Sequence, residues 1–107
     1  MSVLLEFAMF PTSGDCREGG SVSKEVSKII DMIDSGGYAY QLTPMGTVVE
    51  TDTLEEALAV VQKAYDCLGG CERVYSSLKL DIRKGRENRL KQKIASVERQ
   101  LDREVNK

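Results

Sequence analysis

The chain of 107 residues contains no histidine and no tryptophan. Without an imidazole it has no Ser-His or Cys-His nucleophile pair, no histidine-ligated metal and no imidazole base, which excludes many catalytic classes. Neither sign of charge dominates, because 15 Lys and Arg stand against 17 Asp and Glu, for a net charge of −2. A nucleic-acid-binding protein needs a basic surface, so we expect no nucleic-acid partner.

The chain also lacks a long hydrophobic run. Its apolar start, residues 1–10, is interrupted by Glu6, has no basic residues before it and is followed at once by Pro11. A secretory signal needs a charged start and a longer apolar run, and a membrane span needs about 20 apolar residues. We therefore expect a cytoplasmic protein with no membrane partner.

Cysteine is scarce and odd in number, with Cys16, Cys67 and Cys71. An odd count favours reduced thiols over a disulfide framework. Three residues separate Cys67 from Cys71, which is not the C-x-x-C spacing of zinc and redox sites, and no second pair follows to complete a metal site. We expect a structural or incidental role for Cys67 and Cys71, no metal and no cofactor.

What the chain does contain is enough apolar sequence for one domain. Apolar residues make up 41% of the chain and charged residues 30%, a balance typical of folded proteins. A chain of this length buries one core. We expect residues 1–107 to form a single domain.

Hydrophobic periodicity in the first half of the chain predicts strand, helix, strand, strand. A polar, glycine-rich loop precedes the helix, which Ser21 or Ser23 can cap. Pro44 breaks the second strand, and a turn through Met45 and Gly46 leads into the third. The predicted elements are a strand at 3–10, a helix from Ser21 or Ser23 to the Gly36-Gly37 pair, and strands at 38–42 and 47–51.

The second half predicts helix, strand, helix. Thr53 and Glu56 have the spacing of a capping box, which marks the start of a helix that ends before Gly69-Gly70. A strand follows over 73–83, and a last helix runs from about 88 to 105. The apolar face expected for the capped helix comprises Leu54, Ala57, Leu58, Val61, Ala64, Tyr65 and Leu68. The strand residues expected to face the helices are Val74, Ser76, Leu78, Leu80 and Ile82.

This order of elements, βαββαβ plus a C-terminal helix, indicates an α+β fold. Right-handed crossovers place both connecting helices on the same face of one antiparallel sheet. The expected architecture is the ferredoxin-like sandwich, with strands in the order 4-1-3-2.

The sheet face without helices carries charged and apolar residues together. Glu6, Glu50, Lys79, Asp81 and Arg83 are expected to converge there, beside Leu4, Ala8, Phe10 and Val48. A solvated polar face is one reading, but the mixed composition favours cover by a second subunit. The last helix has a narrow apolar seam, which also favours self-association over a helix lying only on its own domain. The seam comprises Leu90, Ile94, Val97 and Leu101.

Paired carboxylates on this face, such as Glu6 with Glu50 or Asp81, are groups that acid–base catalysis uses. Lys79 and Arg83 are expected to pair with them, so we predict a binding protein and not an enzyme. The loop before the first helix has neither a Walker lysine nor G-x-G-x-x-G, which argues against a nucleotide. The third strand lacks the aromatic and basic residues of an RNA-recognition motif.

Four segments carry a family resemblance, namely GGSVSKEV (19–26), MGTVVET (45–51), TLEEALAVVQKAY (53–65) and RVYSSLKLDIRKG (73–85). Together they resemble the small thiamine-binding, YkoF-like family, earlier catalogued as an uncharacterised protein family. The likeness covers roughly residues 3–101. It implies a ferredoxin-like fold and dimers that pair into homotetramers. For some members it also implies binding of thiamine or its hydroxymethylpyrimidine part, without catalysis.

The resemblance also implies which residues bind the ligand. They are Ser21 and Ser23 at the first helix, Met45, Gly46, Thr47 and Glu50 in the turn and third strand, and Lys79, Asp81 and Arg83 in the fourth strand. Glu50 or Asp81 can accept from the amine of an aminopyrimidine, while serine or backbone N–H groups donate to its ring. Tyr38, Tyr40 and Phe10 are alternatives for stacking. The alternative function is a structural or regulatory interaction module without a small ligand.

Overall fold

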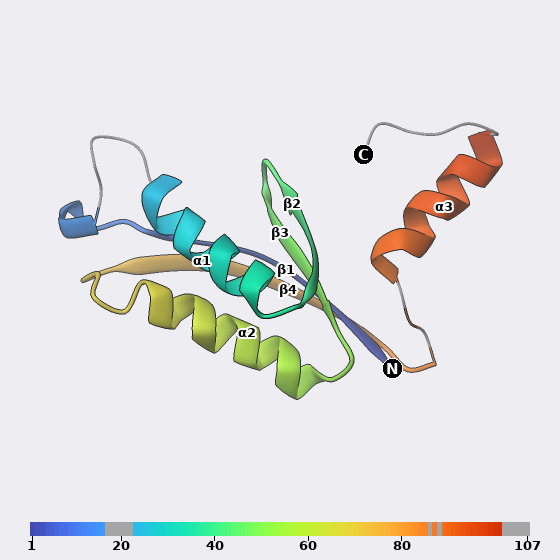
Figure 1. The fold of residues 1–107 in the computed structure, drawn as a ribbon, viewed down its shortest axis with the longest axis horizontal. Coiled ribbons are helices and arrows are strands. Elements are labelled where there is room, and N and C mark those ends of the chain that lie inside the picture. Colours follow the sequence, from blue (N-terminus) through green and yellow to red (C-terminus); the bar gives the residue numbers. More distant parts are fainter. Residues whose placement is uncertain (17–22, 86, 88, 102–107) are drawn as a thin grey trace.

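A computed structural model of the chain describes residues 1–16, 23–85, 87 and 89–101. Four antiparallel strands form one sheet in the order β2-β3-β1-β4, and α1 and α2 lie together on one of its faces (Figure 1). The elements are β1 (Ser2–Pro11), the 3-10 turn η1 (Gly14–Cys16), α1 (Ser23–Ser35), β2 (Ala39–Thr43), β3 (Gly46–Thr51), α2 (Leu54–Cys67), β4 (Val74–Arg83) and α3 (Arg89–Leu101).

This topology confirms the ferredoxin-like α+β prediction, because the sheet order is the expected one read from its other edge. Among the described residues α1 begins at Ser23, and Ser21 lies outside them. The last helix begins at Arg89, and its expected end near residue 105 also lies outside the described chain.

The core lies between β1 and the two helices. Alternate residues of β1 point to this side, and Val3, Leu5 and Phe7 are buried there. They pack against buried residues of α1, β3, α2 and the C-cap of α2, namely Ile29, Ile33, Val49, Ala57, Val60, Ala64 and Leu68. Each large side chain removed from water in this way stabilises the fold by about 1.5–3 kcal/mol.

The start of α2 confirms the predicted cap. The Thr53 Oγ1 accepts a hydrogen bond from the Glu56 N–H at 3.1 Å, and the Thr53 hydroxyl donates to the Glu56 carboxylate at 3.2 Å. The apolar face expected for this helix was wrong at three positions. Val60 is fully buried, whereas Leu58 and Tyr65 are exposed. The buried stripe is rotated toward α1, because α2 packs against α1 as well as the sheet.

The burial of β4 differs from the prediction. Its register with β1 places Leu78, Leu80 and Ile82 on the helix side of the sheet, as predicted. All three are nevertheless exposed, because α2 packs over β1 and β3 and leaves the edge strand uncovered. The helices therefore cover only part of the sheet.

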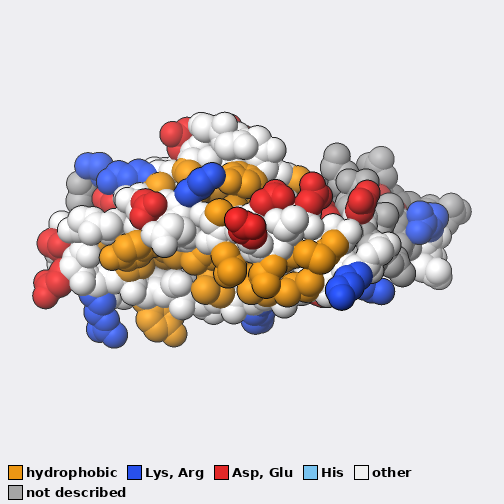
Figure 2. All heavy atoms as spheres, turned by 90° about the horizontal axis from the view of Figure 1, so that it is seen from below, with side chains coloured by type: hydrophobic (Ala, Val, Ile, Leu, Met, Phe, Trp, Pro, Cys, Tyr) orange, Lys and Arg blue, Asp and Glu red, His pale blue; other side chains and the backbone are white. Residues whose placement is uncertain are grey.

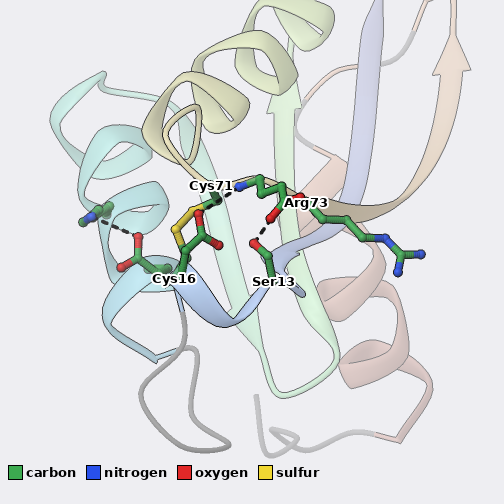
Figure 3. The surroundings of a disulfide bond; sticks show 8 residues. Ser13, Cys16, Cys71 and Arg73 are labelled. Atoms are coloured by element: carbon green, nitrogen blue, oxygen red, sulfur yellow. Dashed lines mark hydrogen bonds and ion pairs between the residues drawn. A yellow bond between two sulfur atoms is a disulfide. The ribbon is translucent and has the colours of Figure 1, made fainter.

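A disulfide joins Cys16 to Cys71, with Cα atoms 5.7 Å apart, so the prediction of reduced thiols was wrong for this pair. Cys67 is the free cysteine among the described residues. The bond links the turn after β1 to the loop before β4 (Figure 3). Two hydrogen bonds reinforce the link, since the Arg73 N–H donates to the Ser13 hydroxyl and the Thr12 N–H donates to the Arg73 carbonyl.

Candidate ligand-binding site

A cavity of about 270 Å³ lies between α1, the end of β1 and the β2–β3 hairpin. We call it the hairpin pocket. Its lining comprises Phe7, Ala8, Met9 and Phe10 of β1, Val26, Ile29 and Ile30 of α1, and Leu42, Thr43, Pro44, Met45, Gly46 and Thr47 of the hairpin. The lining is mostly apolar with a few polar groups, which is the usual character of a small-molecule site. Three predicted site residues, Met45, Gly46 and Thr47, are in it.

The backbone of β1 changes its pairing at this pocket. The strand pairs with β3 only as far as Phe7, opposite Thr47, but with β4 as far as Pro11. Thr12 donates its N–H to Arg73 on the β4 side, and successive residues of a strand direct their N–H and C=O groups to opposite edges. The N–H and C=O of Met9 therefore point to the β3 side, beyond the last paired residue.

The turn that shapes the pocket is held by Thr43. Its hydroxyl donates to the Gly46 carbonyl at 2.8 Å and accepts from the N–H groups of Met45 and Gly46, each at 3.2 Å. Gly46 also lies close to β1, because a Cβ built there would come within 2.9 Å of the Phe7 carbonyl oxygen. A larger residue at Gly46 would push the hairpin away from β1.

A shallower groove runs along the outer side of α1 and shares Val26, Ile30 and Leu42 with the hairpin pocket. Ser23 borders this groove, as do two carboxylates, Asp31 and Asp34. Tyr40 also borders it and donates a hydrogen bond from its hydroxyl to Asp34 at 3.0 Å, which raises the pKa of Tyr40. Of the aromatic residues considered for stacking, Phe10 lines the hairpin pocket and Tyr40 borders the groove.

Three of the other predicted site residues, Glu50, Asp81 and Arg83, lie toward the opposite end of the sheet. Gly46 and Glu50 are four strand positions apart, or about 13 Å. Glu50 holds the start of α3, because its carboxylate accepts from the Arg89 N–H at 2.9 Å and the Leu90 N–H at 3.2 Å. Ser2 donates its hydroxyl to the same carboxylate at 2.6 Å. Glu50 therefore caps a helix distant from it in sequence.

These contacts set the charge of Glu50. Burial raises the pKa of Glu50, but the hydrogen bonds from Ser2, Arg89 and Leu90 and the nearby Arg89 charge outweigh it, so the pKa lies below its ordinary value. Glu50 is therefore a carboxylate at neutral pH. A negative charge at the first turn also interacts favourably with the dipole of α3.

Arg89 completes this cluster, which we call the α3 anchor (Ser2, Glu50, Asp81 and Arg89). Its buried guanidinium donates to the Ser2 hydroxyl at 3.0 Å and the Ser2 carbonyl at 2.8 Å, and it also donates to the Asp81 carbonyl. It forms an ion pair with the Asp81 carboxylate at 2.8 Å. Sequence reasoning missed Arg89, since nothing in its local pattern marks it as an anchor.

Lys79 takes part in a weaker contact on the open face. Its ammonium lies 3.9 Å from the Glu6 carboxylate across the β1–β4 pair, and both side chains are exposed. This contact agrees with the expectation that Lys79 pairs with a carboxylate of the open face. The structure thus brings Met45, Gly46 and Thr47 together near Ser23, and Glu50 together with Asp81, but it keeps these two groups apart.

The described residues contain neither a candidate metal centre nor a helix that could span a membrane. Within that part of the chain no three His, Cys, Asp or Glu residues are grouped as they would be around a metal ion. No described helix has both the length and the apolar character needed to cross a membrane.

Comparison with known families gives a match over residues 5–98 to the family described as thiamine-binding protein. The chain belongs to this thiamine-binding protein family. Similar proteins include a UPF0045 protein of Mycobacterium bovis, 36% identical over 102 residues that cover 94% of this chain and 96% of the relative. A UPF0045 protein of Methanocaldococcus jannaschii is 35% identical over 96 residues, covering 89% and 91%. These findings confirm the resemblance seen in the sequence.

Solved structures of similar proteins have this fold. The crystal structure of the Methanocaldococcus jannaschii protein superposes with a TM-score of 0.74 at 35% identity, covering 90% of this chain and 95% of that one. A candidate thiamine biosynthesis and salvage protein of Thermotoga maritima gives a TM-score of 0.73 at 21% identity, covering 91% and 99%, and this likeness concerns the fold alone.

Proposed function

We propose that this thiamine-binding family member is a non-catalytic binding protein for thiamine or its hydroxymethylpyrimidine part. We further propose that the hairpin pocket holds the pyrimidine ring. The observation that carries the proposal is the edge of β1 at Met9, with which no described strand pairs, next to an apolar pocket in a chain of this family.

An aminopyrimidine matches that edge chemically. Its exocyclic amine donates a hydrogen bond, and the adjacent ring nitrogen accepts one. The Met9 C=O and N–H offer the complementary acceptor and donor, while Phe10 and the α1 residues supply apolar contact for the ring. In this arrangement Met45, Gly46 and Thr47 close the pocket from the hairpin side.

The α1 groove suits the other half of thiamine. The thiazolium ring carries a permanent positive charge, and the groove that opens from the hairpin pocket is bordered by Asp31 and Asp34. We place the pyrimidine in the pocket and the thiazolium over this groove, beside Ser23. In this arrangement Glu50 and Asp81 hold the start of α3 and do not contact the ligand.

Calorimetric titration tests the proposal with three compounds: thiamine, hydroxymethylpyrimidine and the thiazole alcohol of thiamine. We expect saturable heat with thiamine and hydroxymethylpyrimidine but none with the thiazole alone. Absence of heat and of a melting shift with both pyrimidine compounds would refute the ligand.

Two variant pairs locate the site. Phe10→Ala is expected to weaken both pyrimidine compounds about tenfold or more, because it removes part of the pocket wall. Tyr75→Ala is the control, since it breaks the same Phe10–Tyr75 ring contact, 5.8 Å between centroids, without lining the pocket. Equal loss in both variants would mean that the pocket is not the site.

The second pair separates the two halves of thiamine. Asp31→Asn is expected to weaken thiamine by about two- to fivefold and leave hydroxymethylpyrimidine unchanged, because only thiamine carries the cation. Asp52→Asn removes an equal charge at the far end of β3 and should change neither. An equal effect of Asp31→Asn on both ligands would contradict the placement of the thiazolium over the groove.

We also propose that the protein works as a homo-oligomer, a dimer or tetramer, in the cytoplasm. Exposed apolar residues on β4, α2 and α3 support association. The same surface supports the second candidate function, an interaction module without a small ligand. Oligomerisation together with failure to bind either pyrimidine compound would favour that second function.

A further inference from the structure

The helix side of β4 and one flank of α2 both carry exposed apolar side chains. Figure 2 shows hydrophobic side chains gathered in a band along the side of the molecule on which α2 lies. On β4 the exposed residues of the helix side are Leu78, Leu80 and Ile82, and on α2 they are Leu58 and Tyr65. We call these five residues the β4 strip.

The direction of the α2 residues follows from the helix period of 100° per residue. The opposite flank of α2 faces α1, because the Cys67 thiol lies 3.8 Å from the Lys28 carbonyl of α1. On the same flank Lys63 donates at 2.8 Å to the hydroxyl of Tyr38, which follows α1. Leu58 and Tyr65 lie on the flank away from α1. The crossover from β3 to β4 runs through α2, so that flank faces β4.

The backbone of β4 also has an open edge. The Arg73 carbonyl accepts from Thr12, so the odd-numbered residues of this strand direct their N–H and C=O groups to β1. The even-numbered residues, including Leu78, Leu80 and Ile82, direct theirs outward. No described strand pairs with this edge, and such an edge is a template for another strand.

We infer that β4 pairs antiparallel with β4 of a second copy, with Leu80 opposite Leu80 on the two-fold axis. This register places Leu78 opposite Ile82 of the other copy on the helix side. On the open face it places Lys79 opposite Asp81 of the other copy, twice by symmetry. The pairing continues the sheet across two chains and covers the β4 strip. It gives an interface to the proposed homo-oligomer and is independent of the ligand.

Neighbouring registers are less favourable. A shift of one pair in either direction puts Lys79 opposite Lys79 or Asp81 opposite Asp81, and like charges directly opposite one another destabilise a strand pair. A shift of two pairs to centre the dimer on Leu78 replaces the charge pair by Lys79 opposite Ser77 and sets Leu80 opposite Ser76. The register centred on Leu80 aligns both the charges and the apolar residues.

Cysteine cross-linking tests the register. In a Cys67→Ala background, Leu80→Cys is expected to form an intermolecular disulfide, because directly opposed residues in such a pair have Cα atoms about 5.5 Å apart. Ser76→Cys is the control, since its two copies would lie roughly 26 Å apart along the strands. Leu78→Cys probes the register centred on that residue, and its cross-linking in place of Leu80→Cys overturns the proposed register.

Charge exchange tests the pairing itself, read by sedimentation velocity. Lys79→Glu opposes two carboxylates across the axis and is expected to weaken the homodimer more than about tenfold. Asp81→Lys opposes two ammonium groups in the same way, and it also removes the Asp81–Arg89 ion pair within its own chain. An equimolar mixture of the two variants restores both attractive pairs and is expected to form heterodimers. Lys28→Glu is the control, because it also reverses a lysine in an exposed ion pair, but on α1.

The outcomes separate this inference from the function proposed above. A wild-type chain that is monomeric at about 100 μM overturns both the pairing and the homo-oligomer. If the chain is an oligomer, Lys79→Glu does not weaken it and Leu80→Cys forms no intermolecular disulfide, the β4 pairing alone is overturned. Ligand binding is measured separately and decides neither result.

Discussion

The strands β1 and β4 pair residue by residue over ten positions, yet their environments are opposite. Leu5 and Leu80 face each other on the same side of the sheet, but Leu5 is 0% exposed and Leu80 is 43% exposed. Hydrophobic pattern alone does not separate the two strands. The difference arises because the two helices cover the middle of the sheet, whereas neither helix covers its β4 edge.

Both ends of the β1–β4 pair are instead held by contacts outside the core. The Cys16–Cys71 disulfide ties the end of β1 to the start of β4, and Arg89 of the α3 anchor ties Ser2 to Asp81 at the other end. An edge strand without helix cover is thus secured by its ladder and by two clamps.

Truncation of the two facing leucines gives the largest expected contrast. Leu5→Ala should lower the free energy of unfolding by about 3–5 kcal/mol, because it opens a cavity in the core. Leu80→Ala should cost less than about 1 kcal/mol in a single chain, since its side chain is exposed. Urea unfolding at concentrations where the chain is monomeric measures both values. Similar costs for the two would mean that β4 is covered within one chain.

Loss of the disulfide clamp comes next. Cys71→Ser should lower the free energy of unfolding by about 2–4 kcal/mol, because the bond closes a loop across a sequence separation of 55. Cys67→Ser is the matched control and should be nearly neutral, as Cys67 is free. Guanidinium unfolding with and without a dithiol reductant measures both, and wild-type stability insensitive to the reductant would speak against the clamp.

The opposite clamp is expected to be weaker and dependent on pH. Glu50→Gln should cost about 1–2 kcal/mol at pH 7, through loss of charged contacts to the first turn of α3. The pKa of Glu50 is lowered by folding, so the contribution is present above the ordinary value of 4.5 and is lost as the pH falls through the lowered value. The difference between wild type and variant should therefore shrink as the pH falls below 4.5. A difference that does not shrink in acid would contradict the anchor.

The exposed Lys79–Glu6 pair between the same two strands should contribute least. Lys79→Ala is expected to change single-chain stability by no more than about 0.5 kcal/mol, because a surface ion pair at 3.9 Å is well solvated. The Lys79→Ala/Glu6→Ala double-mutant cycle measures the coupling. A coupling above 1 kcal/mol would show that this face is shielded from solvent.

Much of the fold was predictable because period and capping are local signals. Alternation identified β1 and its buried face, and Thr53 with Glu56 identified the start of α2. Burial was less predictable: Leu58 and Tyr65 share the helical spacing of core residues, and only the position of α2 over β1 and β3 leaves them exposed. The pairing of Cys16 with Cys71 depends on two loops meeting in space, which spacing does not reveal.

The candidate site was predictable only in part, because the sequence identifies residues of a local segment but not contacts made through the sheet. The resemblance identified Met45, Gly46 and Thr47, which line the pocket. It gave no sign that Glu50 and Asp81 would contact Arg89, because that contact joins residues 39 and 8 positions apart through the sheet. The Met9 backbone carries no side-chain signal, and only the ladder register reveals its open edge.

The disulfide also determines how the chain would respond to tension. Everything between Cys16 and Cys71, including both helices of the core and the β2–β3 hairpin, lies within the closed loop. A force applied between the two ends of the chain would pass through β1, the sulfur bridge and β4, and would bypass that loop. The residues that form the proposed pocket from α1 and the hairpin would then bear no load until the sulfur–sulfur bond was reduced.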